Sequence, residues 1–234
     1  PFSSTSTSIS ELDAEVLFRK EPHDKSSFAA KVGINSQEIL LPASVSVKGS
    51  FTRNFLKKSL MIKFNEGSSW QGKSKISLNS MVTDDSKLRE WLAWDLIANL
   101  GMVAPNVEHY KVFINKEYIG LYLFVEWIDK TLFERFGMGT QGEFFHPVDR
   151  EFCGDLDIKH LNKTDDCWLK LFPSKLGFSP LEHLINGIHR VDVNQFDEFL
   201  EENFDVDSVI NWFVVNSITS NGDTYNKNYF LFLD

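Results

Sequence analysis

The residues best suited to chemistry lie near the end of the sequence, where four residues separate Asp223 from Asn228 and the apolar run 229–233 follows. A carboxylate can accept a proton from a hydroxyl group, and an amide oxygen is a ligand that hard divalent cations accept. One short loop carrying both groups could therefore orient an attacking hydroxyl and hold a metal ion. Phosphoryl transfer requires this of a protein, because the reaction depends on positioning and charge more than on covalent work.

The spacing of Asp223 and Asn228 is that of a protein-kinase catalytic loop, in which an Asp precedes an Asn by five positions. As an isolated pattern it is weak, since Asp and Asn are abundant in turns, where their side chains bond the local backbone. Other chemistries have less support, because the histidines lack metal-ligand spacing and no Ser/His/Asp or Cys/His grouping stands out. The sequence therefore favours a kinase over a hydrolase.

Composition limits the fold and the partners. With 234 residues, 42% of them hydrophobic, the chain can bury a core as one large domain or as two lobes. A net charge of −9 argues against nucleic acid as a partner, and no apolar run approaches the roughly 18 residues of a membrane span. The basic cluster could be a solvated strand edge or a phosphate-facing strand. Its members are Lys48, Arg53, Lys57, Lys58 and Lys63.

The first half of the sequence predicts strands with one helix. Extended segments are expected at 38–41, 45–47, 60–64, 110–114 and 119–126, the last two joined as a hairpin through 115–117. Gly49 lies between two of these segments and would let the backbone approach a ligand closely. The sequence Asp84-Asp85-Ser86 signals the start of a helix, in which apolar residues recur at helical spacing until Gly101.

The second half is more helical, with helices expected at 129–136, 180–189, 194–203 and 207–217. The fold class is therefore α+β with two lobes. Residues 1–128 form a strand-rich N-lobe, of which the polar residues 1–10 are expected to be flexible, and residues 129–234 form a partial, mainly helical C-lobe. Cys153 and Cys167 could close a small disulfide loop in an exported protein, or they could be unrelated buried thiols.

Four ordered blocks of the sequence resemble the spore coat protein H (CotH) kinase family. They are residues 47–64, residues 85–89 with 100–101 and 104–105, the hairpin from 115 to 126, and residues 221–233. The resemblance covers most of the chain from Val45 onward. It implies an atypical protein-kinase-like two-lobed fold that uses ATP with Mg²⁺ or Mn²⁺ to phosphorylate Ser or Thr of a protein substrate. It also implies an extracellular, cell-surface or spore-coat location, while no oligomeric state is predicted.

The resemblance assigns roles to residues at both ends of the chain. It makes Asp223 the catalytic Asp and Asn228 a metal ligand, and it places Gly49 and Arg53 in the nucleotide-binding loop. By alternation along its strand, Lys63 shares a face with Met61, as the phosphate-binding lysine of a kinase shares one with its neighbouring Ala. Lys63 is therefore the first choice for the phosphates. Lys58 is the second, because it belongs to the same family block.

A lysine that holds phosphates usually needs a carboxylate partner on the neighbouring helix. Glu90 and Asp95 are the candidates, and Glu90 is favoured, with ordinary surface charge as the alternative for both. Glu126 follows the hairpin where the hinge between lobes is expected. It would mark the adenine side of the site, or else be a plain solvent-exposed acid.

A kinase also carries an Asp-Phe-Gly motif after its catalytic loop, and this Asp grips the metal that bridges the phosphates. Asp234 follows the loop too closely for that role. Either these residues are a fragment of a longer polypeptide, or the protein is a degenerate family member. The resemblance therefore predicts a fold truncated at its C-terminal end and little or no transfer activity from these 234 residues alone. Two alternatives to a protein kinase are a non-catalytic kinase-like binding module, such as a coat scaffold or adhesin, and a small-molecule kinase on the same fold.

Overall fold

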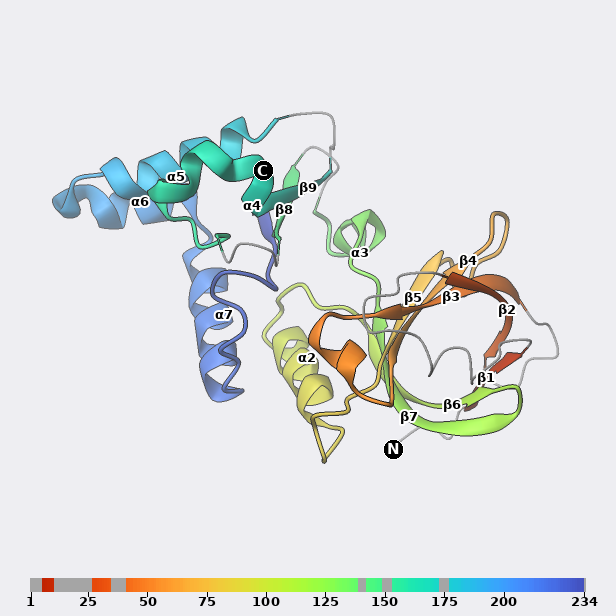
Figure 1. Ribbon diagram of the computed structural model, residues 1–234. Coiled ribbons are helices and arrows are strands. Elements are labelled where there is room, and N and C mark those ends of the chain that lie inside the picture. Colours follow the sequence, from red (N-terminus) through yellow and green to blue (C-terminus); the bar gives the residue numbers. More distant parts are fainter. Residues whose placement is uncertain are drawn as a thin grey trace. The chain divides into compact units, whose positions relative to one another are not determined.

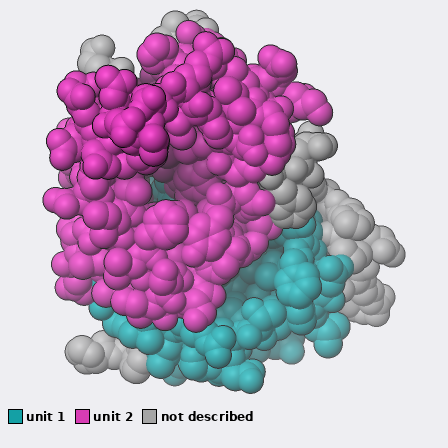
Figure 2. Space-filling model, turned by 90° about the vertical axis from the view of Figure 1, so that its left-hand side faces the viewer, with its two compact units in different colours: residues 1–95, 104–128 teal, residues 96–103, 129–234 magenta. Residues whose placement is uncertain are grey.

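The computed structural model describes residues 6–10, 27–34, 41–138, 142–148, 153–172 and 177–233. Contacts divide the chain into two compact units, which Figure 2 colours separately. Unit 1 comprises residues 1–95 and 104–128, and unit 2 comprises residues 96–103 and 129–234. Both strands and helices are abundant, so the α+β fold class is confirmed, while the kinase-like two-lobed architecture stays a prediction. Among the described helices, none combines the length and apolar character that crossing a bilayer demands.

Unit 1 is built on a curled sheet that closes on itself (Figure 1). In the described residues its strands, in spatial order, are β1 (Ser6–Ser10), β2 (Ser27–Ile34), β3 (Leu41–Lys48), β4 (Ser59–Phe64), β5 (Lys75–Asn79), β7 (Glu117–Glu126) and β6 (Val107–Ile114). Neighbouring strands run antiparallel, except for β1 and β6, whose parallel pairing closes the sheet. Alternation in β3 buries Ala43, Val45 and Val47, so that the next residue, Lys48, emerges on the outer face.

The interior of the curled sheet is a closed apolar core with an aromatic centre. The ring of Trp70 lies edge-on to those of Phe124 and Tyr110, with centroids 5.3 Å and 6.3 Å away. Such edge-to-face pairs add roughly 1 kcal/mol to the free energy gained by burying their area. Because aromatic and aliphatic side chains fill this interior, the polar side chains of the strands are left to the outer face and the ends of the sheet.

The helix α2 (Arg89–Asn99) follows a turn that is fixed by one carboxylate. Asp84 accepts hydrogen bonds from the backbone N–H groups of Ser86 at 3.0 Å and Arg89 at 2.9 Å. These bonds satisfy donors that a helix start leaves without partners inside the helix. On the first turns of α2, Trp91 packs against the buried side chains of Leu123 and Val125 from β7. Asp84 and Trp91 together set where the next residues of this helix point.

Unit 2 contains a small antiparallel sheet and several helices. Its strands, in spatial order, are β10 (Leu231–Leu233), β8 (Glu143–Pro147) and β9 (Trp168–Phe172). Its helical elements are α3 (Lys130–Arg135), η2 (Ile158–Lys163), α4 (Thr164–Cys167), α5 (Ser179–Arg190), η3 (Val193–Gln195), α6 (Phe196–Asn203) and α7 (Val206–Ile218), while the short η1 (Phe51–Asn54) belongs to unit 1. On one face of the sheet, the ring of Phe144 packs at a tilt against those of Phe172 and Phe232, each with a centroid separation of 4.4 Å.

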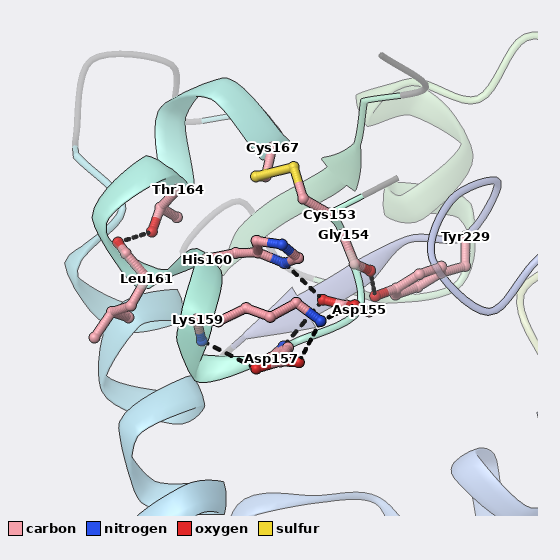
Figure 3. The surroundings of a disulfide bond; sticks show 10 residues. All are labelled: Cys153, Gly154, Asp155, Asp157, Lys159, His160, Leu161, Thr164, Cys167 and Tyr229. Carbon is pink, nitrogen blue, oxygen red and sulfur yellow. Dashed lines mark hydrogen bonds and ion pairs between the residues drawn. A yellow bond between two sulfur atoms is a disulfide. The ribbon is translucent and has the colours of Figure 1, made fainter. Parts of the chain in front are cut away.

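Cys153 and Cys167 form a disulfide, so the first of the two alternatives for these cysteines holds (Figure 3). The Cα atoms are 5.3 Å apart, within the range that a disulfide requires. Both cysteines belong to the buried cluster of unit 2, together with Phe145 and Trp168. The bond therefore joins the segment after β8 to the end of α4, directly before β9, inside the core of this unit.

Most of the expected elements are present, with differences at strands of weak pattern. The hairpin, the strand at 60–64 and the helices of the second half are confirmed. The sequence missed β2, β5, β8 and β9. Residues 6–10 form β1 through backbone pairing with β2 and β6, which needs no apolar side chain, and their expected flexibility stays a prediction. Residues 1–5 and 38–40 lie outside the described residues.

Candidate catalytic loop and polar cluster

The loop that carries Asp223 and Asn228 lies between α7 and β10 in unit 2. Its start is tied to the last turns of α7, since the backbone N–H of Asn221 donates to the Asn216 carbonyl at 2.8 Å. The side-chain amide of Asn221 also donates to the side-chain oxygen of Asn216 at 2.8 Å. Asn216 is buried, so α7 offers the loop a fixed anchor. Thr224, inside the loop, is buried as well.

The structure brings Asp223 and Asn228 together. The Asn228 Nδ2 group donates to the Asp223 carbonyl at 2.7 Å and to the carboxylate oxygen Oδ2 at 3.1 Å. Lys227 Nζ lies 2.9 Å from the other carboxylate oxygen, Oδ1. Asn228 itself adopts a φ of 58°, a left-handed conformation that Asn tolerates better than most residues. The side chain of Asp223 is 70% exposed, so a substrate hydroxyl could reach its carboxylate.

The oxygens in this loop fit a hard divalent cation in part. With Nδ2 turned to Asp223, the Asn228 side-chain oxygen is the group that could face a metal, beside the carboxylate. Within the ranges that the structure describes, no three His, Cys, Asp or Glu side chains gather as a metal site would need. Mg²⁺ suits such a sparse donor set, because it keeps waters and substrate phosphates as most of its ligands. The loop could therefore contribute to a metal–nucleotide site without forming a protein cage.

A second polar cluster lies on the outer face of the sheet in unit 1. Lys48 Nζ, at the end of β3, donates to Ser77 Oγ at 2.5 Å and to Asn79 Oδ1 at 2.9 Å, both on β5. The amide of Asn79 donates in turn to Glu90 Oε1 on α2, at 2.6 Å. Strand register explains the reach of Lys48, because only the small Ser59 of β4 stands in the row between β3 and β5.

Burial opposes the charges of this cluster. The pKa of the Lys48 ammonium is lowered because burial removes its water, and the nearby Glu90 carboxylate offsets part of the effect. The pKa of Glu90 is raised by the same loss of water, against which the hydrogen bond from Asn79 and the charge of Lys48 act. The two charges therefore stabilise each other across Asn79. An additional anion beside Lys48 would favour its charged form further.

Three basic side chains of the segment after β3 donate to backbone carbonyls. Arg53 donates to the carbonyls of Gly49 and Val47. Lys58, which is buried, donates to the Arg53 carbonyl at 2.5 Å, and Lys57 donates to the carbonyls of Ser80 at 2.8 Å and Leu121 at 2.5 Å. These bonds fold the loop onto itself and onto β7. Gly49 has a φ of 94°, which a residue with a Cβ rarely adopts.

The remaining candidates lie away from the polar cluster of unit 1. The side chain of Lys63 is exposed on the outer face of β4, in register with Lys75. Asp95 is an exposed residue on the later turns of α2. Glu126 is 5% exposed, and its carboxylate pairs with Lys73 at 2.7 Å and accepts from the Asn106 backbone N–H at 2.9 Å. This burial excludes the alternative of a solvent-exposed acid at Glu126.

The sequence indicated a lysine with a carboxylate partner on the neighbouring helix, but it did not show which lysine contacts the network of Glu90. The sequence offers a phosphate-facing role to the whole basic cluster, Lys48 included, and singles out Lys63 and Lys58. The structure instead links Lys48, and neither of these two, to Glu90 through Asn79. No sequence pattern indicates the roles of Asn79, which bonds Lys48 and Glu90, and of Lys227, which pairs with Asp223. The strand register is what reveals the position of Lys48. Lys48 at the end of β3 is paired with Ser59 of β4, and the register of β4 with β5 then leads to Asn79. The missed strand β5 hid this row.

Comparison with known proteins agrees with the blocks described above. The chain is 28% identical over 221 residues to the "Inner spore coat protein H" of Bacillus subtilis (strain 168), an alignment that covers 92% of this chain. The chain spans 59% of the length of that relative. The family model described as "CotH kinase protein" matches residues 45–234, a range that includes the polar cluster of unit 1 and the loop of Asp223. The chain belongs to the CotH kinase protein family.

Proposed function

We propose that this chain is the core of an ATP- and divalent-metal-dependent protein Ser/Thr kinase of the CotH type, acting on spore-coat or surface proteins. The observation that carries the proposal is the joined pair of Asp223 and Asn228, whose side chains meet at 3.1 Å in an exposed loop. A turn that used Asp and Asn only to cap its backbone would not require the two side chains to bond each other. Membership of the CotH kinase protein family supports this chemistry.

In the proposed reaction each residue has a limited task. The Asp223 carboxylate would orient a Ser or Thr hydroxyl and accept its proton, while Lys227 balances the charge of the carboxylate. The Asn228 side-chain oxygen would hold Mg²⁺ or Mn²⁺, which when bound neutralises charge on the phosphates. We assign the phosphate-binding lysine to Lys48, because the side chain of Asn79 links it to the carboxylate of Glu90. Lys63 and Lys58 rank lower, since one is exposed and the other donates to a backbone carbonyl.

The disulfide supports an oxidising location for the protein. A disulfide buried in the core of unit 2 persists where thiols are not kept reduced, as in secreted proteins and at cell or spore surfaces. The relative named for the inner spore coat points the same way. We therefore propose an extracellular, surface or coat location, where the acceptors would be Ser and Thr residues of neighbouring coat proteins.

The test is phosphoryl transfer by the polypeptide that the gene encodes. Radiolabelled ATP with Mg²⁺ or Mn²⁺ is incubated with an extract of coat proteins, and label on protein Ser and Thr is measured. Asp223→Asn should lower the rate by roughly 100-fold or more, which is the contribution of a positioned base. Asp207→Asn serves as the matched control, because Asp207 is an exposed acid at the start of α7.

Three results would overturn the proposal. Transfer that survives Asp223→Asn within twofold would remove the catalytic role of the carboxylate. ATP binding without transfer to any polypeptide by the wild-type protein would identify a binding module, and label found only on sugars or lipids would identify a small-molecule kinase.

A further inference from the structure

Tyr229, the residue after Asn228, is held from two sides. Its hydroxyl donates to the Gly154 carbonyl at 2.5 Å, and its own carbonyl lies 2.9 Å from His146 Nδ1 on β8. The ring packs edge-on against Trp168 on β9, with centroids 5.7 Å apart. A residue fixed at its backbone and at the tip of its side chain leaves its neighbour little freedom. The peptide that joins Asn228 to Tyr229 is therefore anchored to unit 2.

The disulfide ties together the two partners of Tyr229. Gly154 directly follows Cys153 and Trp168 directly follows Cys167, and the two cysteines are bonded. Figure 3 shows the Tyr229 hydroxyl reaching the Gly154 carbonyl beside this bond. Without the bond, the segment that carries Gly154 would lose its covalent link to the residue that precedes β9.

Gly154 also touches the loop directly. A Cβ on Gly154 would lie 2.9 Å from the backbone oxygen of Asn226 and 2.3 Å from the Pro147 Cβ atom. No side chain fits in that space, so the backbone at 154 forms a wall against the loop between Asp223 and Asn228. The conformation of Asn228, with φ at 58°, is one that an unsupported chain populates rarely. The support comes from Gly154 and Tyr229.

We infer that Tyr229 is a positioning residue for Asn228, and that the Cys153–Cys167 disulfide acts through Tyr229 and Gly154 to hold the loop in its metal-binding conformation. This inference rests on the proposed function for the role of Asn228 as a metal ligand. The anchoring of the loop itself does not depend on any bound metal. The two parts can therefore be measured separately.

The experiment compares three variants of the full chain with the wild type. Tyr229→Phe removes the hydroxyl and keeps the ring against Trp168. A double variant, Cys153→Ala with Cys167→Ala, removes the disulfide. Thr164→Val is the matched control, because it deletes a hydroxyl that donates to the Leu161 carbonyl at 2.8 Å in the same unit, away from Tyr229. Amide hydrogen exchange of residues 221–230 is measured without metal, and Mn²⁺–ATP binding is measured by titration well below each unfolding temperature.

Tyr229→Phe and the double variant should both speed exchange in residues 221–230. Tyr229→Phe should weaken Mn²⁺–ATP binding by roughly 2- to 10-fold, the effect of losing one neutral hydrogen bond, and the double variant should weaken this binding too. Thr164→Val should change neither. Equal exchange in Tyr229→Phe and Thr164→Val, or unchanged Mn²⁺–ATP affinity in Tyr229→Phe, would overturn the inference. If the wild type binds no Mn²⁺–ATP, the proposed function fails, and the exchange comparison alone decides whether Tyr229 holds the loop.

Discussion

Replacing Lys48 by Met tests the assignment of the phosphate-binding lysine. The unbranched Met side chain keeps much of the length and apolar volume of lysine while removing the ammonium group. Lys63→Met is the matched control, because it makes the same chemical change at an exposed site of the neighbouring strand β4. If the proposal is right, only the change at Lys48 removes a charge that meets the nucleotide.

The size of the effect follows from the contacts of Lys48. A hydrogen bond to a charged group contributes about 1.5–3 kcal/mol, so losing one to a phosphate should raise the dissociation constant roughly 10- to 100-fold. The cost to folding should be smaller, about 1 kcal/mol, since Asn79 Oδ1 keeps the hydroxyl of Ser77 at 3.2 Å when Lys48 is removed. Glu90 also keeps its bond from Asn79. The Lys48→Met variant should therefore remain folded.

The assay is a titration of Mn²⁺–ATP, read by calorimetry, with urea unfolding of each variant as a check on folding. Lys48→Met should bind at least tenfold more weakly than the wild type, and Lys63→Met should bind within twofold of it. A larger loss for Lys63→Met than for Lys48→Met would refute the assignment to Lys48 and restore the lysine favoured by strand alternation alone. Equal, small losses in both variants would mean that neither ammonium meets the phosphates.

Two further predictions concern the supports of the site. Asp84→Ala should lower the free energy of unfolding, measured with urea, by about 1–2 kcal/mol. Asp85→Ala is the control, because Asp85 is exposed. Burial acts to raise the pKa of Asp84, but hydrogen bonds from Ser86 and Arg89 hold this pKa below the ordinary 3.8. The ionised carboxylate therefore contributes its full stability above pH 3.8. The difference in stability between Asp84→Ala and the wild type should vanish as the pH falls through the lower pKa of the folded state. Replacing Cys153 and Cys167 by Ala should lower the free energy of unfolding by about 3 kcal/mol, given their separation of 14 residues. A thiol reductant should lower the stability of the wild type by the same amount. An unchanged free energy of unfolding in both experiments would contradict a stabilising role for the disulfide.

Local patterns predicted the elements whose signals are strong in a short window. The hairpin around Asn115 has apolar residues on both sides of a polar turn, and the helices of unit 2 begin at capping residues such as Asp129 and Asp205. By contrast, β5 carries Lys75, Ser77 and Asn79 on alternate positions, so it reads as a weakly apolar loop. Its strand state comes from pairing on both sides, with β4 and β7, which no local window contains.

The same distinction separates the predicted from the missed site residues. Asp223 and Asn228 are close in sequence, so their contact could be expected from spacing alone. Lys48, Asn79 and Glu90 meet only because β4 sets the register between β3 and β5 and because Asp84 fixes the start of α2. The periodicity of apolar residues within one segment does not reveal the register between strands that are distant in sequence. Sequence alternation correctly placed Lys63 on the face of Met61, but it could not show that this part of the face is open to solvent.

The basic residues of the family block have a consequence for how the proposed site would meet a nucleotide. Arg53, Lys57 and Lys58 donate to carbonyls of the chain, so their charges serve the loop's conformation. Lys48, by contrast, donates to side chains of β5, and Asn79 links it to the Glu90 carboxylate, which is why we assign the phosphates to it. One ammonium in a protein of net charge −9 is a weak attractor for a free triphosphate. The proposed enzyme should therefore recognise the metal complex of ATP, whose lower negative charge suits the one ammonium of Lys48.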